Sequence, residues 1–172
     1  MGYDISTRLG DKAKAEQFAK KYGYGYMFNK ENGEYEGDDT PYFRANIWGM
    51  GTIRDVFAYI YTKASRNDQE KFVEIMNKFS WNDGAHVTAP DCEYLITLWD
   101  KDKAIDAIVM DLHIESEADP NYLKTKQWDE DAKTFKDYTA TVDEVVENRV
   151  ALCEEFIDYL GIAKELDGCL VW

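Results

Sequence analysis

TVDEVVENRVALCEEFIDYLG, residues 141–161, is the stretch that shows most clearly how this chain folds. Thr141, followed three positions later by Glu144, is a capping box, in which two side chains satisfy backbone N–H groups at a helix start. Apolar residues then recur at helical spacing as far as Gly161, a residue type that commonly follows a helix. These apolar residues are Val142, Val145, Val146, Leu152, Cys153, Phe156, Ile157 and Leu160. The stretch predicts one long amphipathic helix with one side packed on a core.

The other side of this predicted helix is acidic. It carries Asp143, Glu147, Glu154, Glu155 and Asp158. The acidity belongs to the whole second half of the chain, because residues 1–86 hold 13 Asp and Glu against 12 Lys and Arg, whereas residues 87–172 hold 21 against 8. The two halves therefore carry −1 and −13 of the net charge of −14. A surface of one sign repels nucleic acid and anionic lipid and attracts basic surfaces.

The first third of the chain predicts a small antiparallel sheet. A short helix is expected between Asp11 and Gly23, followed by strand spacing at residues 24–28 and 34–36 around the hairpin signal Asn32-Gly33. A further strand or extended segment is expected over residues 42–48, ended by glycines.

Helical patterns dominate the middle of the chain. Helices are expected to begin at Thr52, at Asn67 or Asp68, and after Thr88, with a break or bend at residues 100–103. Residues 115–140 are polar and lack a clear period, so we expect an irregular connection there, with room for a short helix or strand. Residues 168–172 are expected to add a terminal strand.

These patterns together predict a single α+β domain over residues 1–172. It is helix-rich, with a sheet-containing part at residues 1–50, helical parts at 52–114 and 141–161, and an irregular connection at 115–140. At 172 residues, 45% of them hydrophobic, the chain can bury a core of its own.

Composition and the first residues favour a cytoplasmic protein. No apolar run reaches the roughly 18 residues of a membrane span, and the opening Met-Gly-Tyr-Asp has neither the basic start nor the apolar stretch of a secretory signal. Cys92, Cys153 and Cys169 are odd in number and widely spaced, which favours buried thiols over a disulfide framework or a zinc site.

Several short segments resemble a group of small uncharacterised bacterial and phage proteins. They are the opening Met-Gly-Tyr-Asp, the segment Tyr42–Met50 before a helix, Asn82-Asp83-Gly84, and the short apolar end at Trp172. The resemblance implies a protein from a bacterial or phage setting, acting in the bacterial or host cytoplasm. It carries no catalytic residue to this chain.

No motif for catalysis, metal binding or cofactor binding stands out. Asp100 and Asp102 have the spacing that opens a calcium loop, but Ile105 and Asp111 occupy the positions where that loop needs Gly and Glu. The glycine pairs lack the rest of a phosphate-binding loop. We therefore expect no catalytic, metal or cofactor residues, and an enzyme is the less favoured reading.

Two functional hypotheses follow. The first is a non-enzymatic interaction protein, such as a phage-encoded inhibitor or anti-defence factor, whose residues Asp143, Glu147, Glu154, Glu155 and Asp158 bind a basic surface of a protein that handles nucleic acid. Acidity also serves solubility, which is the competing explanation. Direct binding of nucleic acid or membrane is not expected, and self-association is left open.

The second hypothesis is a small-molecule-binding protein or enzyme. Its pocket would lie between the Tyr42–Trp48 segment and the Asn82–Gly84 loop. The polar and aromatic residues selected for it are Arg44, Asn46, Trp48 and Asp83, because they lie in aromatic, glycine-flanked segments rather than on regular helix faces.

Overall fold

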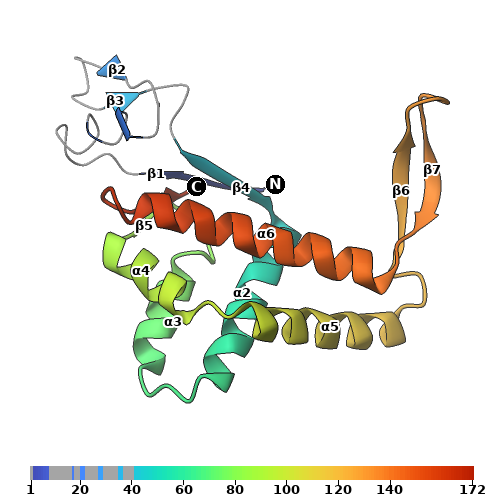
Figure 1. Ribbon diagram of the computed structural model, residues 1–172, viewed down its shortest axis with the longest axis horizontal. Helices are drawn as coiled ribbons and strands as arrows, with labels where there is room; N and C mark the ends of the chain where they lie inside the picture. The colour runs from blue at the N-terminus through green and yellow to red at the C-terminus, as the bar shows by residue number, and fades with distance from the viewer. Residues whose placement is uncertain (1, 8–16, 18–19, 22–26, 29–34, 37–40) are drawn as a thin grey trace.

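A four-stranded antiparallel sheet lies against a group of helices in the computed structural model (Figure 1). The structure describes residues 2–7, 17, 20–21, 27–28, 35–36 and 41–172. The strand order is β4-β1-β8-β5. The strands are β1 (Gly2–Thr7), β4 (Tyr42–Asn46), β5 (Ala85–Val87) and β8 (Cys169–Val171).

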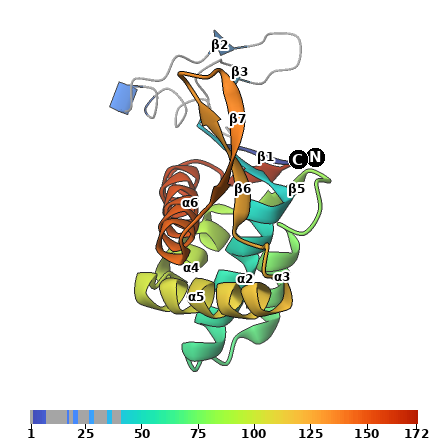
Figure 2. The same ribbon diagram turned by 90° about the vertical axis from the view of Figure 1, so that its right-hand side faces the viewer.

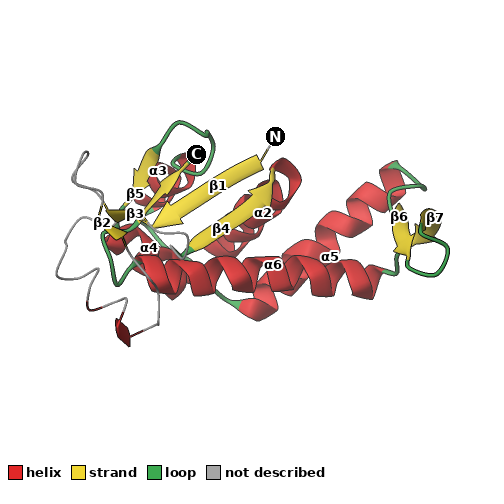
Figure 3. Ribbon diagram, turned by 90° about the horizontal axis from the view of Figure 1, so that it is seen from above, coloured by secondary structure: helices red, strands yellow, loops and turns green. Residues whose placement is uncertain are grey.

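Five helices are present in the described part of the chain. They are α2 (Ile47–Lys63), α3 (Gln69–Asn77), α4 (Ala89–Leu98), α5 (Lys101–Ala118) and α6 (Val142–Ala163). Two further strand pairs are β2 (Met27–Phe28) with β3 (Tyr35–Glu36), and β6 (Lys124–Asp129) with β7 (Thr134–Thr139). Viewed from above, α6 runs beside the sheet and α5 continues beyond it (Figure 3).

The ring of Phe156 on α6 lies at the centre of the core. Its centroid is 5.2 Å from that of Phe43 on β4, 5.4 Å from that of Phe79 after α3, and 6.3 Å from that of Phe57 on α2. Sheet and helices thus share one hydrophobic cluster. The prediction of a single helix-rich α+β domain with a small antiparallel sheet is confirmed.

The helix starts read from capping residues are confirmed at Thr141 and Thr88, and the break or bend predicted at residues 100–103 is a break where a new helix begins. Thr141 and Glu144 form the predicted capping box of α6, and Thr88 forms another with Asp91 at the start of α4. Asp100 accepts a hydrogen bond from the Lys103 backbone N–H at 3.1 Å, which begins α5 as a separate helix. These side chains replace the backbone partners that a first helical turn lacks.

The predicted start of α2 at Thr52 is wrong. The helix begins at Ile47, because the side chain of Asn46 accepts a hydrogen bond from the Gly49 backbone N–H at 2.7 Å and caps it. Gly49 lies inside the helix rather than ending a strand. A Cβ there would lie 3.0 Å from Cδ2 of Leu152, so glycine allows α2 to approach α6 closely.

The sheet is not confined to the first third of the chain. β5 and β8 come from residues 85–87 and 169–171, and β8 pairs with both β1 and β5. β1 and β5 had no predicted counterpart. The predicted terminal strand is β8, and the predicted pairing around Asn32-Gly33 appears as β2 with β3, although the turn itself and the helix expected between Asp11 and Gly23 lie largely outside the described residues.

Residues 115–140 are more regular than the expected irregular connection, which left room for only a short helix or strand. α5 runs to Ala118, and β6 and β7 form a hairpin that we call the arm (Figure 1). Most arm residues are exposed on both faces, so the alternation of apolar and polar residues that marks a half-buried strand is missing. Polar strands of this kind give no periodic signal.

We predict that Gly168→Ala strongly destabilises the protein. Gly168 has φ +84°, and a Cβ there would lie 2.0 Å from the Val87 carbonyl oxygen, so β8 could not keep its place beside β5. A loss of about 3 kcal/mol or more in the free energy of unfolding is expected from the clash and the strained backbone. Urea denaturation measures it.

The matched control is Gly161→Ala. It lies in α6 with no heavy atom within 4 Å of the added Cβ, so it should leave stability unchanged or raise it by up to about 1 kcal/mol. Equal effects of the two substitutions would contradict this account of Gly168.

Candidate functional site

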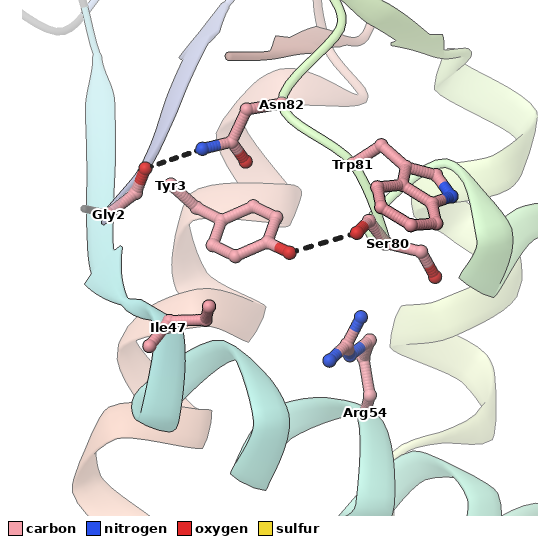
Figure 4. Close-up of a pocket in the computed structure, with 7 residues that line it drawn as sticks. All are labelled: Gly2, Tyr3, Ile47, Arg54, Ser80, Trp81 and Asn82. Carbon is pink, nitrogen blue, oxygen red and sulfur yellow. Dashed lines mark hydrogen bonds between the residues drawn. The ribbon is translucent and has the colours of Figure 1, made fainter.

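A cavity of about 440 Å³ lies where the start of β1, the first turns of α2 and the loop after α3 meet (Figure 4). It is lined by Gly2, Tyr3, Ile47, Arg54, Ser80, Trp81 and Asn82. The cavity exists because α2 begins directly at the end of β4, which brings its first turns beside β1.

Two hydrogen bonds hold the loop after α3 to β1. The Tyr3 hydroxyl donates to the Ser80 carbonyl oxygen at 3.0 Å, and the Asn82 side-chain amide donates to the Gly2 carbonyl oxygen at 2.6 Å. Both bonds are drawn in Figure 4. They fix the walls of the cavity, while the Tyr3 ring itself belongs to the buried core.

Arg54 is the charged group of the cavity. Figure 4 shows its guanidinium group directed from α2 toward the space beside Tyr3 and Trp81. Among the arginines that the structure describes, Arg44, Arg66 and Arg149 each form an ion pair with an aspartate. No described carboxylate lies within ion-pair distance of Arg54, and partial burial raises the pKa of its chain neighbour Asp55 despite the nearby guanidinium.

An exposed indole stands next to this guanidinium. The Trp81 side chain is 72% exposed, and Ile47 on the opposite wall is 47% exposed. A guanidinium group offers N–H donors in a planar fork that matches a carboxylate or phosphate. An indole offers a flat apolar face. The arrangement can therefore bind an anion attached to a flat apolar group.

A larger groove of about 1150 Å³ lies at the foot of the arm and shares Ile47 and Arg54 with the cavity. Trp48, 82% exposed, lines this groove together with Tyr122 and Arg149. The groove is further lined by Gly51, Thr52, Asp55, Asp111, Glu115, Leu123, Lys124, Thr125, Ala140, Val145 and Asn148.

An ion pair organises the floor of this groove. Nη1 of Arg149 donates to Asp111 at 2.6 Å, and Nη2 donates to the Tyr122 hydroxyl at 2.7 Å. Partial burial raises the pKa of the Asp55 carboxyl group, and the nearby Asp111 carboxylate raises it further. The cations and anions in the groove largely balance, so it carries no strong charge of either sign.

The four residues selected from sequence for a pocket do not gather around one cavity. Arg44 is exposed on β4 and pairs with Asp4 at 3.5 Å, Asn46 caps α2, and Asp83 accepts a hydrogen bond from the Ala85 backbone N–H at 3.1 Å. Trp48 lines the groove. Roles in ligand binding for these four stay predictions.

The cavity nevertheless lies between the two predicted segments, since Ile47 comes from Tyr42–Trp48 and Asn82 from Asn82–Gly84. Sequence reasoning missed Tyr3, Arg54 and Trp81. Arg54 gave no sequence signal of its own, because it follows the apolar Ile53 near the predicted helix start at Thr52. Trp81 borders the predicted loop and could have been included on its aromatic character.

The predicted acidic side of α6 is exposed. Asp143, Glu147, Glu155 and Asp158 lie on the solvent side of the helix, and no described Lys or Arg lies within ion-pair distance of them. Glu154 pairs with Lys101 of α5 at 2.7 Å.

Within the described residues, few ion pairs join the opening half of the chain to the acidic half. In the described residues, lysines from before residue 87 pair with Asp91 and Glu165 of the second half. Most other ion pairs of the second half are internal, such as Lys164 with Glu93 at 2.6 Å. The acidic side of α6 therefore keeps most of its charge.

Three further observations concern chemistry and location. Within the described ranges, no three His, Cys, Asp or Glu side chains are arranged so that they could hold a metal ion. The described helices include none that is both long and apolar enough to cross a membrane. The three cysteines are buried and form no disulfide, as predicted for structural thiols. Burial raises the pKa of the Cys153 thiol to about 12.

The comparisons with known proteins give no relative. No protein-family model matches the sequence, no curated protein matches it, and no solved structure matches it.

Proposed function

We propose that the protein binds a ligand in the Arg54 cavity, and that this ligand carries a carboxylate next to a flat apolar group. The observation behind the proposal is Arg54 itself. The chain has 34 acidic residues for 20 basic ones, yet the guanidinium in this cavity has no described ion-pair partner. A ligand carboxylate would fill the place that aspartates fill at the other described arginines.

The surroundings of Arg54 favour a carboxylate with an apolar body. A carboxylate can accept two parallel hydrogen bonds from the guanidinium fork. The Trp81 indole and the Ile47 side chain would lose water-exposed apolar surface against a flat group. The net charge of −14 disfavours a doubly charged phosphate more than a singly charged carboxylate. A small organic acid and the C-terminus of a peptide share this chemistry.

We predict that phenylacetate binds in the cavity and shifts the NMR signals of the Trp81 indole N–H and the Ile47 methyl groups. Arg54→Gln should weaken binding about tenfold or more, because a hydrogen bond to a charged group contributes about 1.5–3 kcal/mol. Phenylacetamide, which has the same ring without the charge, should bind the original protein about as weakly as phenylacetate binds Arg54→Gln.

The control variant is Arg44→Gln, which removes an exposed, ion-paired arginine outside the cavity and should leave binding unchanged. A peptide ending in Phe, compared in its forms with a free and an amidated C-terminus, tests whether the ligand carboxylate can be the C-terminus of a peptide. If phenylacetate shifts neither signal, or binds Arg54→Gln as well as the original protein, the cavity does not have this function.

A second function is supported by a different observation, the unpaired carboxylates of α6. We propose that Asp143, Glu147, Glu155 and Asp158 form a contact surface for a basic protein. Like charges held on one rigid helix repel one another, and a basic partner would relieve that repulsion. Basic protein surfaces commonly bind nucleic acid. By occupying such a surface, this protein would act as an inhibitor of its partner.

We predict that this contact surface retains bacterial proteins in a salt-dependent way. The test compares immobilised protein with a variant in which the four α6 carboxylates are changed to Asn or Gln, in lysate at low and high salt. Retention by the original protein should fall steeply at high salt because exposed charges are screened. The neutralised variant should retain little at either salt.

The matched control neutralises four exposed carboxylates outside α6, namely Glu70, Asp102, Asp106 and Glu117. It removes the same charge, so any difference between the two variants belongs to the α6 surface. Equal retention by all three proteins, or retention that high salt does not reduce, would contradict the second function.

A further inference from the structure

The arm projects from the body of the molecule. It rises from the ends of α5 and α6, and two views at right angles show its outer part standing clear of the helices (Figures 1 and 2). In β6 and β7, Asp129 and Tyr138 are half-buried and the other residues are exposed. A hairpin of two strands is at best marginally stable in water. Among the residues that the structure describes, none provides the arm with the third strand or covering element that hairpins usually have.

The arm also carries exposed aromatic residues. The rings of Trp128 and Phe135 meet edge to face with their centroids 5.1 Å apart, yet they remain 45% and 62% exposed. At the foot of the arm, the Tyr138 hydroxyl donates to Glu144 at 2.6 Å. This contact fixes the base of the arm and leaves both outer strand edges without described partners.

We propose that the β6 edge pairs with β6 of a second copy of this chain. The two strands would run antiparallel across a two-fold axis and join the two arms into one four-stranded sheet. Main-chain hydrogen bonds between free strand edges are a common mode of protein association. This proposal depends on neither the Arg54 cavity nor the acidic surface of α6.

The sequence of β6 selects one register for this pairing. A two-fold axis perpendicular to the sheet places one residue opposite its own copy. Two such registers overlap most of β6, one centred on Lys126 and one centred on Gln127. The first would place two lysines opposite each other, which is unfavourable. The second pairs Gln127 with Gln127.

The other pairs in the Gln127 register are complementary. Lys124 lies level with Glu130 of the second copy, the first residue of the turn after β6, while Thr125 lies opposite Asp129 and Lys126 opposite Trp128. These are an ion pair, a hydroxyl–carboxylate contact and a cation–π contact. Each occurs twice in the dimer because the axis repeats it.

The β7 edge does not offer an equivalent register. Its central registers place Lys136 opposite Lys136 or Asp137 opposite Asp137. Pairing through β7 is therefore disfavoured, and the four-stranded sheet would not extend further. The result is a closed dimer, as most two-fold assemblies are.

The groove lies at the foot of the β6 edge. β6 lies on the side of the arm nearer the sheet (Figure 1), and its residues Lys124 and Thr125 line the groove of about 1150 Å³. In the Gln127 register, the turn of the second copy begins beyond Thr125, at the level of this groove. The tip of the second arm would thus reach the groove.

The first test is the molar mass of the full chain in solution, measured by light scattering during size-exclusion chromatography. The proposal requires a mass of twice 19.9 kDa that dissociates on dilution. Lys124→Glu and Glu130→Lys should each raise the dissociation constant about tenfold, because each replaces two ion pairs with two repulsions. An equimolar mixture of the two variants should dimerise again, since both pairs are complementary in the mixed dimer.

Lys63→Glu, on α2 and exposed, is the control for a change of charge outside the arm and should leave the dissociation constant unchanged. Circular dichroism confirms that each variant is folded. Recovery in the mixture also separates loss of pairing from loss of folding.

The second test is a cysteine crosslink that reads the register. Gln127→Cys places two thiols opposite each other at the axis, within the range of a disulfide. Thr125→Cys places them about 14 Å apart along the strands. The native cysteines are buried and give little background. Under mild oxidation, Gln127→Cys should give a covalent dimer and Thr125→Cys should not.

A protein that stays monomeric at the highest concentrations overturns the proposal. So does a dimer whose Gln127→Cys variant does not crosslink, or crosslinks no better than Thr125→Cys. Because these tests need neither phenylacetate nor lysate, their failure would leave both proposed functions standing.

Discussion

The packing of the Phe156 ring is the interaction on which the rest of the structure depends. This ring meets Phe43 of the sheet, Phe57 of α2 and Phe79 after α3, so one side chain of α6 joins elements that are far apart in the sequence. Once this side of α6 is buried, its other side must face water. The acidic surface is therefore a consequence of the same helix orientation that builds the core.

The two ends of the chain complete the support of the Arg54 cavity. β8 is held between β1 and β5, and the backbones of Asp4 and Trp172 exchange hydrogen bonds of 2.8 and 2.7 Å. The Trp172 ring lies against Gly84, where a Cβ would approach it to 2.8 Å. The loop carrying Trp81 is thus fixed at its far end by the C-terminal strand. The cavity wall is part of the sheet architecture.

Charge and exposed aromatic surface are separated in this molecule. Four exposed carboxylates without a described ion pair, Asp143, Glu147, Glu155 and Asp158, lie along α6, whereas exposed indoles occur at the cavity, at the groove and on the arm, in Trp81, Trp48 and Trp128 respectively. Large exposed aromatic side chains favour contact with another molecule, because burying them removes much apolar surface from water. The three contacts that we propose, with a ligand, a basic protein and a second copy, therefore involve distinct surfaces of the fold.

The long, capped helices and the terminal strand β8 could be predicted from the sequence, whereas β1, β5 and the hairpin of the arm could not. Thr141 with Glu144, and Thr88 before Pro90, are local signals that act within one helical turn, so no tertiary information is needed to read them. β5 spans only Ala85–Val87, and its pairing with β8 joins residues more than 80 positions apart. Nothing local in the sequence specifies such a pairing.

The candidate site, too, could be predicted only where local signals in the sequence mark it. Each of the two segments selected from the sequence contributes one residue to the cavity, Ile47 and Asn82, but none of the four selected residues lines it. The sequence did not identify Arg54, whose significance is the absence of an acidic partner, and partners are known only once the chain has folded. The arm was missed because strands exposed on both faces carry no hydrophobic period.

The most direct measurement of the central claim is the free energy of unfolding of Phe156→Ala, compared with that of Glu155→Ala beside it. If the Phe156 ring joins sheet and helices, its removal should cost about 3–5 kcal/mol, and the sheet and helices should still unfold in a single transition. The exposed Glu155 substitution should change stability by less than about 0.5 kcal/mol. A loss below about 1 kcal/mol for Phe156→Ala would contradict the account, because a ring at the centre of a core cannot be removed so cheaply.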